Sequence, residues 1–370
     1  MPGAAKRNPG FDCLRLLCAF CVVCIHIPYP YKHLVEVTTR FAVPVFFIVS
    51  GWFYSQLCSN HRQHIYLKKI VRIFLLANIA TFAFWLICRK YVHMDTAAYV
   101  STISQASSWI LYLLLNKPIF NESLWYLGAM VYVLLIVNVA DRISSRKKLY
   151  PLIPLLLGMN LILGNYSMIF FRMHIPLCCS RNFLFAGLPF FLIGDKLRQK
   201  TPKWSNTFLL AALSLSLGFG LMENYILYKT GLQTNIDLYL FTPLTAISLF
   251  LLTANNPGWF ETRVFHHIAT LGKDLSLWIY ILHPLVIQAV TYYLWLEGSP
   301  LALLASVYTR IGPILIFTLT SLIAAAICKC ANMLKKKCAF PLLTSDPHKK
   351  RACSQKAARP IINIFIQALQ

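Results

Sequence analysis

The sequence predicts an all-α integral membrane protein with about ten transmembrane helices and cytoplasmic N- and C-termini. Hydrophobic residues make up 58% of the 370 residues, charged residues only 13%, and the mean hydropathy is +0.60. Apolar runs of about 16 or more residues, close to the length of a bilayer-spanning helix, recur from Phe11 to Cys328. The third observation is an uneven distribution of basic residues between alternate loops.

The first apolar run follows Lys6 and Arg7 and ends at Pro28. Because no small-residue cleavage pattern follows it, we expect a retained first helix rather than a signal peptide. The polar first half of residues 98–115 favours an interfacial or re-entrant helix over a full span. The expected spans are residues 11–28, 37–57, 66–88, 122–141, 149–164, 182–198, 205–221, 237–254, 271–295 and 301–328.

The orientation follows from the 35 Lys and Arg residues. If the chain starts in the cytoplasm and crosses ten times, most of them lie in cytoplasmic segments, as in other multi-pass membrane proteins. The net charge of +23 then indicates contact with membrane lipids, and we expect no nucleic-acid partner. The predicted organisation is a cytoplasmic N-terminus at 1–10, a membrane domain at 11–330 and a basic cytoplasmic tail at 331–370.

Arg15 and His26 are ionisable residues inside the first predicted span, where such residues usually face protein or water. Eleven helical residues return to within about 20° of the starting direction and rise about 16.5 Å. The pair therefore shares one stripe, with Arg15 near the cytoplasm and His26 near the far end. This arrangement suits an anionic cofactor with a long arm. The alternative is that both side chains reach toward lipid headgroups.

The stretch from Arg15 to His26 resembles the R-x10-H motif of the acyltransferase-3 family of membrane proteins. Arg181 and Asn182, followed by GLPFF, resemble the branch that contains the membrane domains of vancomycin-resistance serine racemases. Five further segments resemble family landmarks in the expected order: residues 43–51 (VPVFFIVSG), 67–73 (LKKIVRI), 124–128 (LWYLG), 187–194 (GLPFFLIG) and 271–284 (LGKDLSLWIYILHP).

The resemblance implies transfer of an acyl group, acetyl by default, from cytoplasmic acyl-CoA to a hydroxyl of an envelope glycan or another small acceptor. The acyl-CoA is a co-substrate, and no tightly bound cofactor is expected. Imidazole has the basicity to deprotonate an attacking hydroxyl, so His26 is the expected general base or transient acyl carrier. The expected ligands of the CoA phosphates are Arg15, Lys68, Lys69 and Arg72. Lys69 stands where the family favours arginine, and it lacks the bidentate guanidinium.

Two further residues are possible accessories to this site. His283 precedes Pro284 in an apolar helix, where a helix kink with a hydrogen-bonded imidazole is the simpler interpretation. Arg181 is expected on the outer side, where it would hold an anionic acceptor or meet lipid phosphate. Trp52, Trp125 and Tyr126 are expected in interfacial aromatic belts. No metal site is expected, because the loop histidines have no matching cysteine or carboxylate cluster.

Two other functions remain compatible with the sequence. A permease for a small polar solute, such as an amino acid, also needs charge within the membrane. A catalytically silent scaffold is the third possibility. The Arg15–His26 pair and the basic segment near residue 69 favour the acyltransferase, which we expect in the cytoplasmic (inner) membrane of a bacterium as a multi-pass protein.

Overall fold

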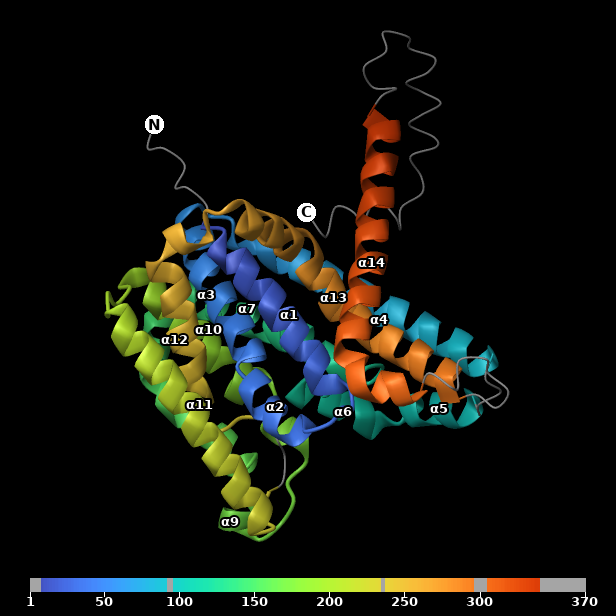
Figure 1. The fold of residues 1–370 in the computed structure, drawn as a ribbon, viewed down its shortest axis with the longest axis horizontal. Coiled ribbons are helices and arrows are strands. Elements are labelled where there is room, and N and C mark those ends of the chain that lie inside the picture. The colour runs from blue at the N-terminus through green and yellow to red at the C-terminus, as the bar shows by residue number, and fades with distance from the viewer. Residues whose placement is uncertain (1–7, 92–95, 234–236, 296–304, 340–370) are drawn as a thin grey trace.

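A computed structural model describes residues 8–91, 96–233, 237–295 and 305–339 (Figure 1). Within these ranges every regular element is a helix and no strand occurs, which confirms the predicted all-α class. Residues 1–7 and 340–370 lie outside the described residues, and with them most of the predicted N-terminal segment and basic tail.

The first half of the chain alternates long helices with short connecting ones. Pro28 follows the end of the first helix, as expected. The predicted short segment at 98–115 forms two helices that meet at Gln105, whose backbone is extended, and neither is long enough to span a bilayer. The elements are α1 (Gly10–His26), α2 (Lys32–Thr39), α3 (Ala42–Ser59), α4 (Gln63–Tyr91), α5 (Thr96–Ser104), α6 (Ala106–Leu115), η1 (Glu122–Leu124) and α7 (Trp125–Ile143).

The second half contains the longest helices as well as several irregular turns. A π-helical turn, η4, precedes α10, so the span expected at 182–198 becomes a turn and a 12-residue helix. The elements are η2 (Arg146–Leu152), α8 (Ile153–Leu163), α9 (Ser167–Phe171), η3 (Leu177–Cys179), η4 (Phe183–Gly187), α10 (Leu188–Gln199), α11 (Asn206–Lys229), α12 (Thr242–Asn255), η5 (Pro257–Phe260), α13 (Arg263–Trp295) and α14 (Ala305–Ala339).

Among the described residues, six helical segments are long and apolar enough to cross a bilayer. The helices α1, α8, α10 and α12 fall at predicted spans but have only 17, 11, 12 and 14 residues. About ten crossings and cytoplasmic termini therefore stay predictions. The six segments are Lys32–Ser59, Gln63–Lys90, Glu122–Ile143, Asn206–Lys229, Arg263–Tyr292 and Ala305–Met333.

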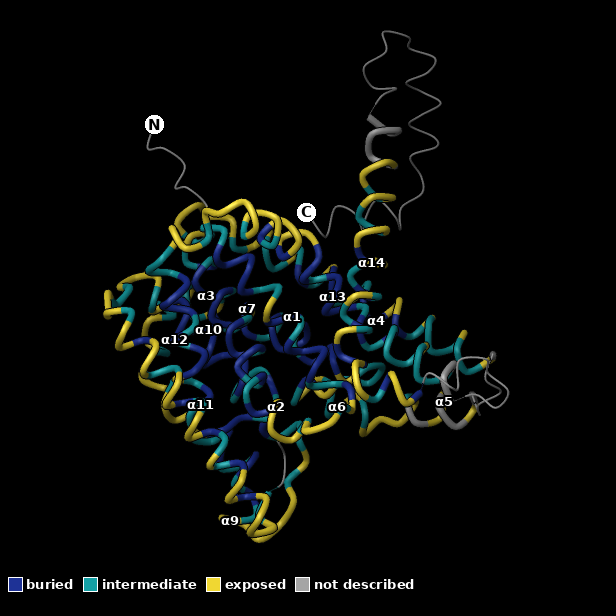
Figure 2. The backbone as a smooth tube through the Cα atoms, viewed as in Figure 1, coloured by how far each residue is buried: buried dark blue, intermediate teal, exposed yellow. Residues whose placement is uncertain are grey.

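Burial separates the inner helices from the outer ones. In Figure 2 the buried backbone lies mainly along α1, α3, α7 and α10, whereas α11 and α14 carry long exposed stretches. Exposed side chains on these two helices include Phe208, Leu215, Phe219, Ile314 and Leu322. An apolar surface of this kind is costly in water but matches the hydrocarbon of a bilayer.

Two glycines allow α3 and α10 to pack in close contact. A Cβ added to Gly51 would lie 2.0 Å from the carbonyl oxygen of Phe191, and one added to Gly194 would lie 1.9 Å from that of Ile48. Both glycines end sequence segments that resemble family landmarks, 43–51 and 187–194. Small residues permit such close approach between membrane helices. Gly51 and Gly194 therefore let the two backbones touch.

A third glycine joins α1 to α13. A Cβ on Gly272 would lie 2.0 Å from the carbonyl oxygen of Asp12. Near the other end of α1, the rings of His26 and His283 approach to 5.2 Å between centroids. Because both contacts advance along the two helices in the same order, α1 and α13 run in parallel. Their pairing brings the two histidines together.

An ion-pair cluster anchors the turn after α7 to α10. Arg146 donates from Nε and Nη2 to the Asp195 carboxylate at 2.9 and 3.0 Å, and from Nη1 to Asp141 at 2.6 Å. The Tyr150 hydroxyl donates to the same buried Asp195 at 2.6 Å. Arg146 therefore joins the turn after α7 to α10 through a buried carboxylate.

Candidate active site

A cavity of about 250 Å³ opens among α1, α3, α4, α7 and α13. Its lining includes the cations Arg15, Lys69 and Lys273. Arg15 is within 3.4 Å of Asp12 and stacks its guanidinium over Phe53 at 5.3 Å, so its position is fixed from two sides. A cluster of cations facing one cavity suits a polyanionic ligand such as a phosphate group.

The structure distinguishes among the predicted phosphate-binding residues. Lys69 is half-buried and lines the cavity together with Arg15, as expected. Lys68 and Arg72 are exposed and do not line it, so their role at its entrance stays a prediction. Lys273, from the segment that resembles the last family landmark, also lines this cavity, although no pattern in the sequence singled it out.

His26 and His283 form the second part of the site. Nε2 of His26 lies 3.5 Å from the Ser123 hydroxyl, and its ring is 5.2 Å from that of His283. His283 is fully buried, and its Nδ1 donates to the Ile279 carbonyl oxygen at 3.0 Å. In the neutral ring its Nε2 is then an acceptor, and among the described residues this atom has no hydrogen-bond partner.

A series of side chains with hydroxyl groups lies between the cations and the histidines. The Tyr126 hydroxyl lies 3.4 Å from the Ser50 hydroxyl, and both residues line the cavity. The Tyr126 ring packs edge-on against Tyr280 at 5.4 Å. Tyr280 in turn donates a hydrogen bond to the carbonyl oxygen of Ser123, the residue whose hydroxyl contacts His26. The cavity thus ends at Tyr280, one hydrogen bond from Ser123, while Ser123, His26 and His283 lie beyond its lining.

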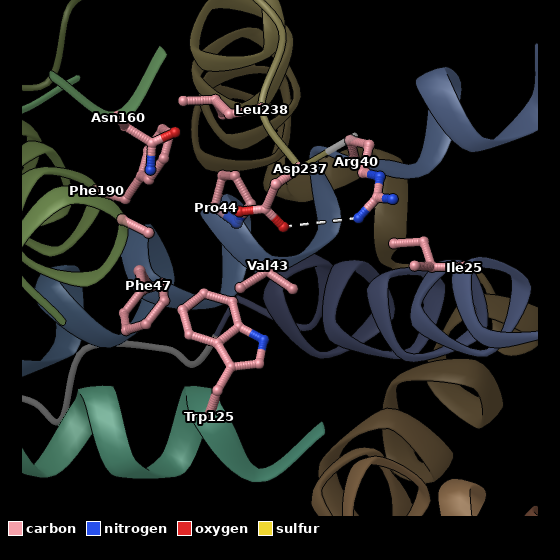
Figure 3. Close-up of a pocket in the computed structure, with 11 residues that line it drawn as sticks. Ile25, Arg40, Val43, Pro44, Phe47, Trp125, Asn160, Phe190, Asp237 and Leu238 are labelled. Atoms are coloured by element: carbon pink, nitrogen blue, oxygen red, sulfur yellow. Dashed lines mark ion pairs between the residues drawn. The ribbon is translucent and has the colours of Figure 1, made fainter. Parts of the chain in front are cut away.

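The tryptophans expected in an aromatic belt are instead part of the interior. Trp52 and Trp125 are only 7% and 8% exposed, and both belong to the main hydrophobic core. Figure 3 shows Trp125 in a pocket beside Phe47, beneath an ion pair between Arg40 and Asp237 at 3.7 Å. The prediction was wrong because an aromatic residue near the end of a predicted span fits a lipid interface and a packed helix junction equally well.

Arg181 is the accessory cation that the sequence singled out beside this site. Arg181 lies over the Trp125 ring at 5.6 Å and near Glu122 at 3.8 Å. Its ion-pair partner Glu122 precedes Ser123, whose hydroxyl contacts His26, so Arg181 lies toward the histidine end of the site, and its accessory role stays a prediction.

The acyltransferase domain profile of the acyltransferase-3 family matches residues 8–330. The chain belongs to the acyltransferase-3 family. The matched region of this acyltransferase-3 chain begins just before α1 and extends into α14, so it contains every residue of the candidate active site.

Two relatives belong to the racemase branch that the sequence resembles. A serine/alanine racemase of Enterococcus gallinarum is 28% identical over 318 residues, covering 78% of this chain and 42% of its own. An amino-acid racemase of Enterococcus faecalis is 27% identical over 315 residues, covering 77% and 42%. The acyltransferase-3 chain thus matches less than half the length of each racemase. No solved structure matches the chain significantly.

Proposed function

We propose that this acyltransferase-3 protein is a membrane O-acyltransferase. In this proposal it takes an acyl group, by default acetyl, from cytoplasmic acyl-CoA and transfers it to a hydroxyl of an envelope carbohydrate or a small acceptor. The supporting observation is the cavity that begins at Arg15 and Lys69 and ends at Tyr280, which bonds to Ser123 beside His26. We place the protein in the bacterial cytoplasmic membrane, in line with its several apolar helices.

The cationic end of the cavity suits the phosphates of an acyl-CoA co-substrate. Arg15, Lys69 and Lys273 would hold them, and the exposed Lys68 and Arg72 would attract the ligand from solution. The rise from Arg15 to His26 along α1, about 16.5 Å, matches a ligand with phosphates at one end and a reactive thioester at the end of a long arm. Binding at the phosphates would thereby position the thioester for reaction.

His26 is the proposed reacting base. In a direct transfer, the acceptor oxygen attacks the thioester carbonyl as its proton moves to the imidazole, the carbon–sulfur bond breaks, and the thiolate takes up that proton. In a two-step transfer, the imidazole nitrogen displaces the thiolate first; the acceptor oxygen then displaces the imidazole and gives its proton to a base, from which the thiolate takes it up. Both routes need an unprotonated ring nitrogen at His26, and both are assisted by a second base, for which His283 is the proposed residue.

The test of this proposal is transfer of label from radioactive acetyl-CoA into membrane material. We compare wild type with His26→Ala and with His64→Ala, a matched control because His64 is exposed and does not line the cavity. Loss of the base is expected to reduce transfer roughly 10²- to 10⁴-fold in His26→Ala only. Wild-type transfer by His26→Ala at equal expression would show that the proposal is wrong.

The relatives favour one alternative function. Their names describe racemases of serine, alanine and other amino acids, so the membrane domain they share with this chain is compatible with passage of an amino acid. This permease would move serine into proteoliposomes without acetyl-CoA. Uptake that persists in His26→Ala, together with no label transfer by wild type, would favour the permease over the enzyme.

A further inference from the structure

Arg181 is a nearly buried cation without a strong internal partner. Its side chain is 14% exposed, and its ion pair with Glu122 spans 3.8 Å to a carboxylate whose side chain is 85% exposed. Within the described residues its guanidinium stacks on Trp125 but makes no hydrogen bond. A guanidinium that is largely shielded from water and makes no hydrogen bond within the described residues keeps its donors available for a ligand.

The backbone around Arg181 is held rigidly. The adjacent Asn182 is 1% exposed, accepts hydrogen bonds from the amides of Leu184 and Phe185, and donates to the carbonyls of Cys178 and Cys179. The Arg181 amide donates to the Leu177 carbonyl oxygen at 2.8 Å. The position of this guanidinium is therefore set before any ligand binds, which lowers the entropic cost of binding.

Arg40, the neighbouring arginine in Figure 3, serves as a contrast. Its guanidinium is paired with Glu36 on its own helix and with Asp237 across the pocket, at 3.7 Å. Two carboxylates already neutralise this cation. Arg40 therefore stabilises the pocket wall, whereas the charge of Arg181 is not matched by a buried anion.

Arg181 also lies at the end of the site that holds the proposed base His26. Its ion-pair partner Glu122 precedes Ser123, whose hydroxyl is 3.5 Å from Nε2 of His26. The exposure of Glu122 places this end of the site at the protein surface. A molecule entering there would meet Arg181 and His26 together.

We propose that Arg181 binds an anionic group, a carboxylate or a phosphate, of the acceptor and thereby places its hydroxyl at His26. This inference rests on the proposed function and specifies its acceptor class: a hydroxyl compound that carries a negative charge, such as an acidic sugar, a phosphosugar or a hydroxy acid. The planar guanidinium matches either anion with two parallel hydrogen bonds. Glu122 is displaced into solvent when the anion binds.

The experiment has a transfer arm and a binding arm. Membranes containing wild type, Arg181→Lys, Arg181→Gln or the exposed control Arg172→Gln receive labelled acetyl-CoA, and the charge of the product is determined by anion exchange. In the binding arm, the melting temperature of each purified protein is measured with glucuronate and with its neutral counterpart glucose. It is also measured with glycerol 3-phosphate and with glycerol, so that the effects of a carboxylate and of a phosphate are separated from that of a neutral hydroxyl compound.

We expect an anionic product and transfer reduced roughly 10- to 100-fold in Arg181→Gln, with Arg181→Lys in between and Arg172→Gln unchanged. A neutral product, or full transfer by Arg181→Gln, overturns the inference while the proposed function stands. If wild type transfers no label, the proposed function fails, and the melting temperatures alone decide whether Arg181 binds an anion. Anion-specific stabilisation that disappears in Arg181→Gln then supports the anion site, and equal melting of both proteins overturns it.

Discussion

At the scale of single residues, the two histidines differ in what holds them. His26 contacts a serine hydroxyl and is half-buried at the end of α1. His283 is fully buried, and only its Nδ1 has a partner. The kink-and-hydrogen-bond interpretation explains Nδ1 of His283 but not its second nitrogen. A buried polar atom without a partner is costly, which indicates a group outside the chain, such as a bound ligand, as its hydrogen-bond partner.

Two substitutions separate the roles of the His283 nitrogens. An asparagine amide can replace the Nδ1 donor to Ile279, and a glutamine amide reaches the place of Nε2. If Nε2 assists the reaction, the rate of acetyl transfer will fall roughly 10²-fold in His283→Asn while its melting temperature stays that of wild type, and His283→Gln will retain more activity. Rates of both purified variants check this. An active His283→Asn would assign the residue a purely structural role.

At the scale of helices, paired glycines determine which elements meet. Gly51 and Gly194 bring α3 against α10, and Gly272 brings α13 against α1. These contacts form walls of the candidate site, since α1, α3 and α13 all line the cationic cavity. Three of the segments that resemble family landmarks, 43–51, 187–194 and 271–284, thus contain the glycines at which these helices meet.

The helix contacts predict an ordered series of stabilities. Gly51→Ala and Gly194→Ala would each place a methyl group within 2.0 Å of a backbone oxygen, so we expect a loss of about 1–3 kcal/mol or more through overpacking. Gly218→Ala in α11 meets no atom within 4 Å and should gain roughly 0.5–1 kcal/mol of helix stability. Melting of the detergent-solubilised proteins provides the measurement. Equal stability of all three variants would contradict close α3–α10 packing.

At the scale of the whole molecule, the two ends of the candidate site carry different side chains. Cations collect at the Arg15 end of the cavity, and the histidines with Arg181 lie at the opposite end of α1. The basic residues of the chain predict that the Arg15 end faces the cytoplasm. Donor and acceptor would then approach from opposite faces of the membrane.

Sealed vesicles test which face of the membrane the Arg15 end of the site meets, because acetyl-CoA does not cross a bilayer. We expect label transfer in inverted vesicles, where the predicted cytoplasmic face is outside, and none in right-side-out vesicles given external acetyl-CoA. Permeabilising the second preparation with detergent should restore transfer, because charged donors then reach both faces. Transfer in intact right-side-out vesicles alone would reverse the assigned orientation.

The sequence predicted a helix well where the apolar run was long and unbroken. Long apolar runs became helices near their expected positions, such as α4, α7 and α13. The expected spans at 37–57 and 182–198 did not form single helices. Their breaks depend on distant contacts: Arg40 pairs with Asp237 between α2 and α3, and Phe183 at the start of η4 donates to the Asn116 side chain.

The sequence by itself determined the membrane class, the family, and the choice of His26 and Arg15, because hydrophobic periodicity and residue spacing along one helix are local properties. Only the tertiary structure decided that Lys69 rather than its neighbour Lys68 lines the cavity, that His283 meets His26, and that Arg181 stacks on Trp125. Such contacts depend on how separate helices pack. Close packing brings together side chains that are far apart in the sequence, and nothing in the sequence marks them as neighbours.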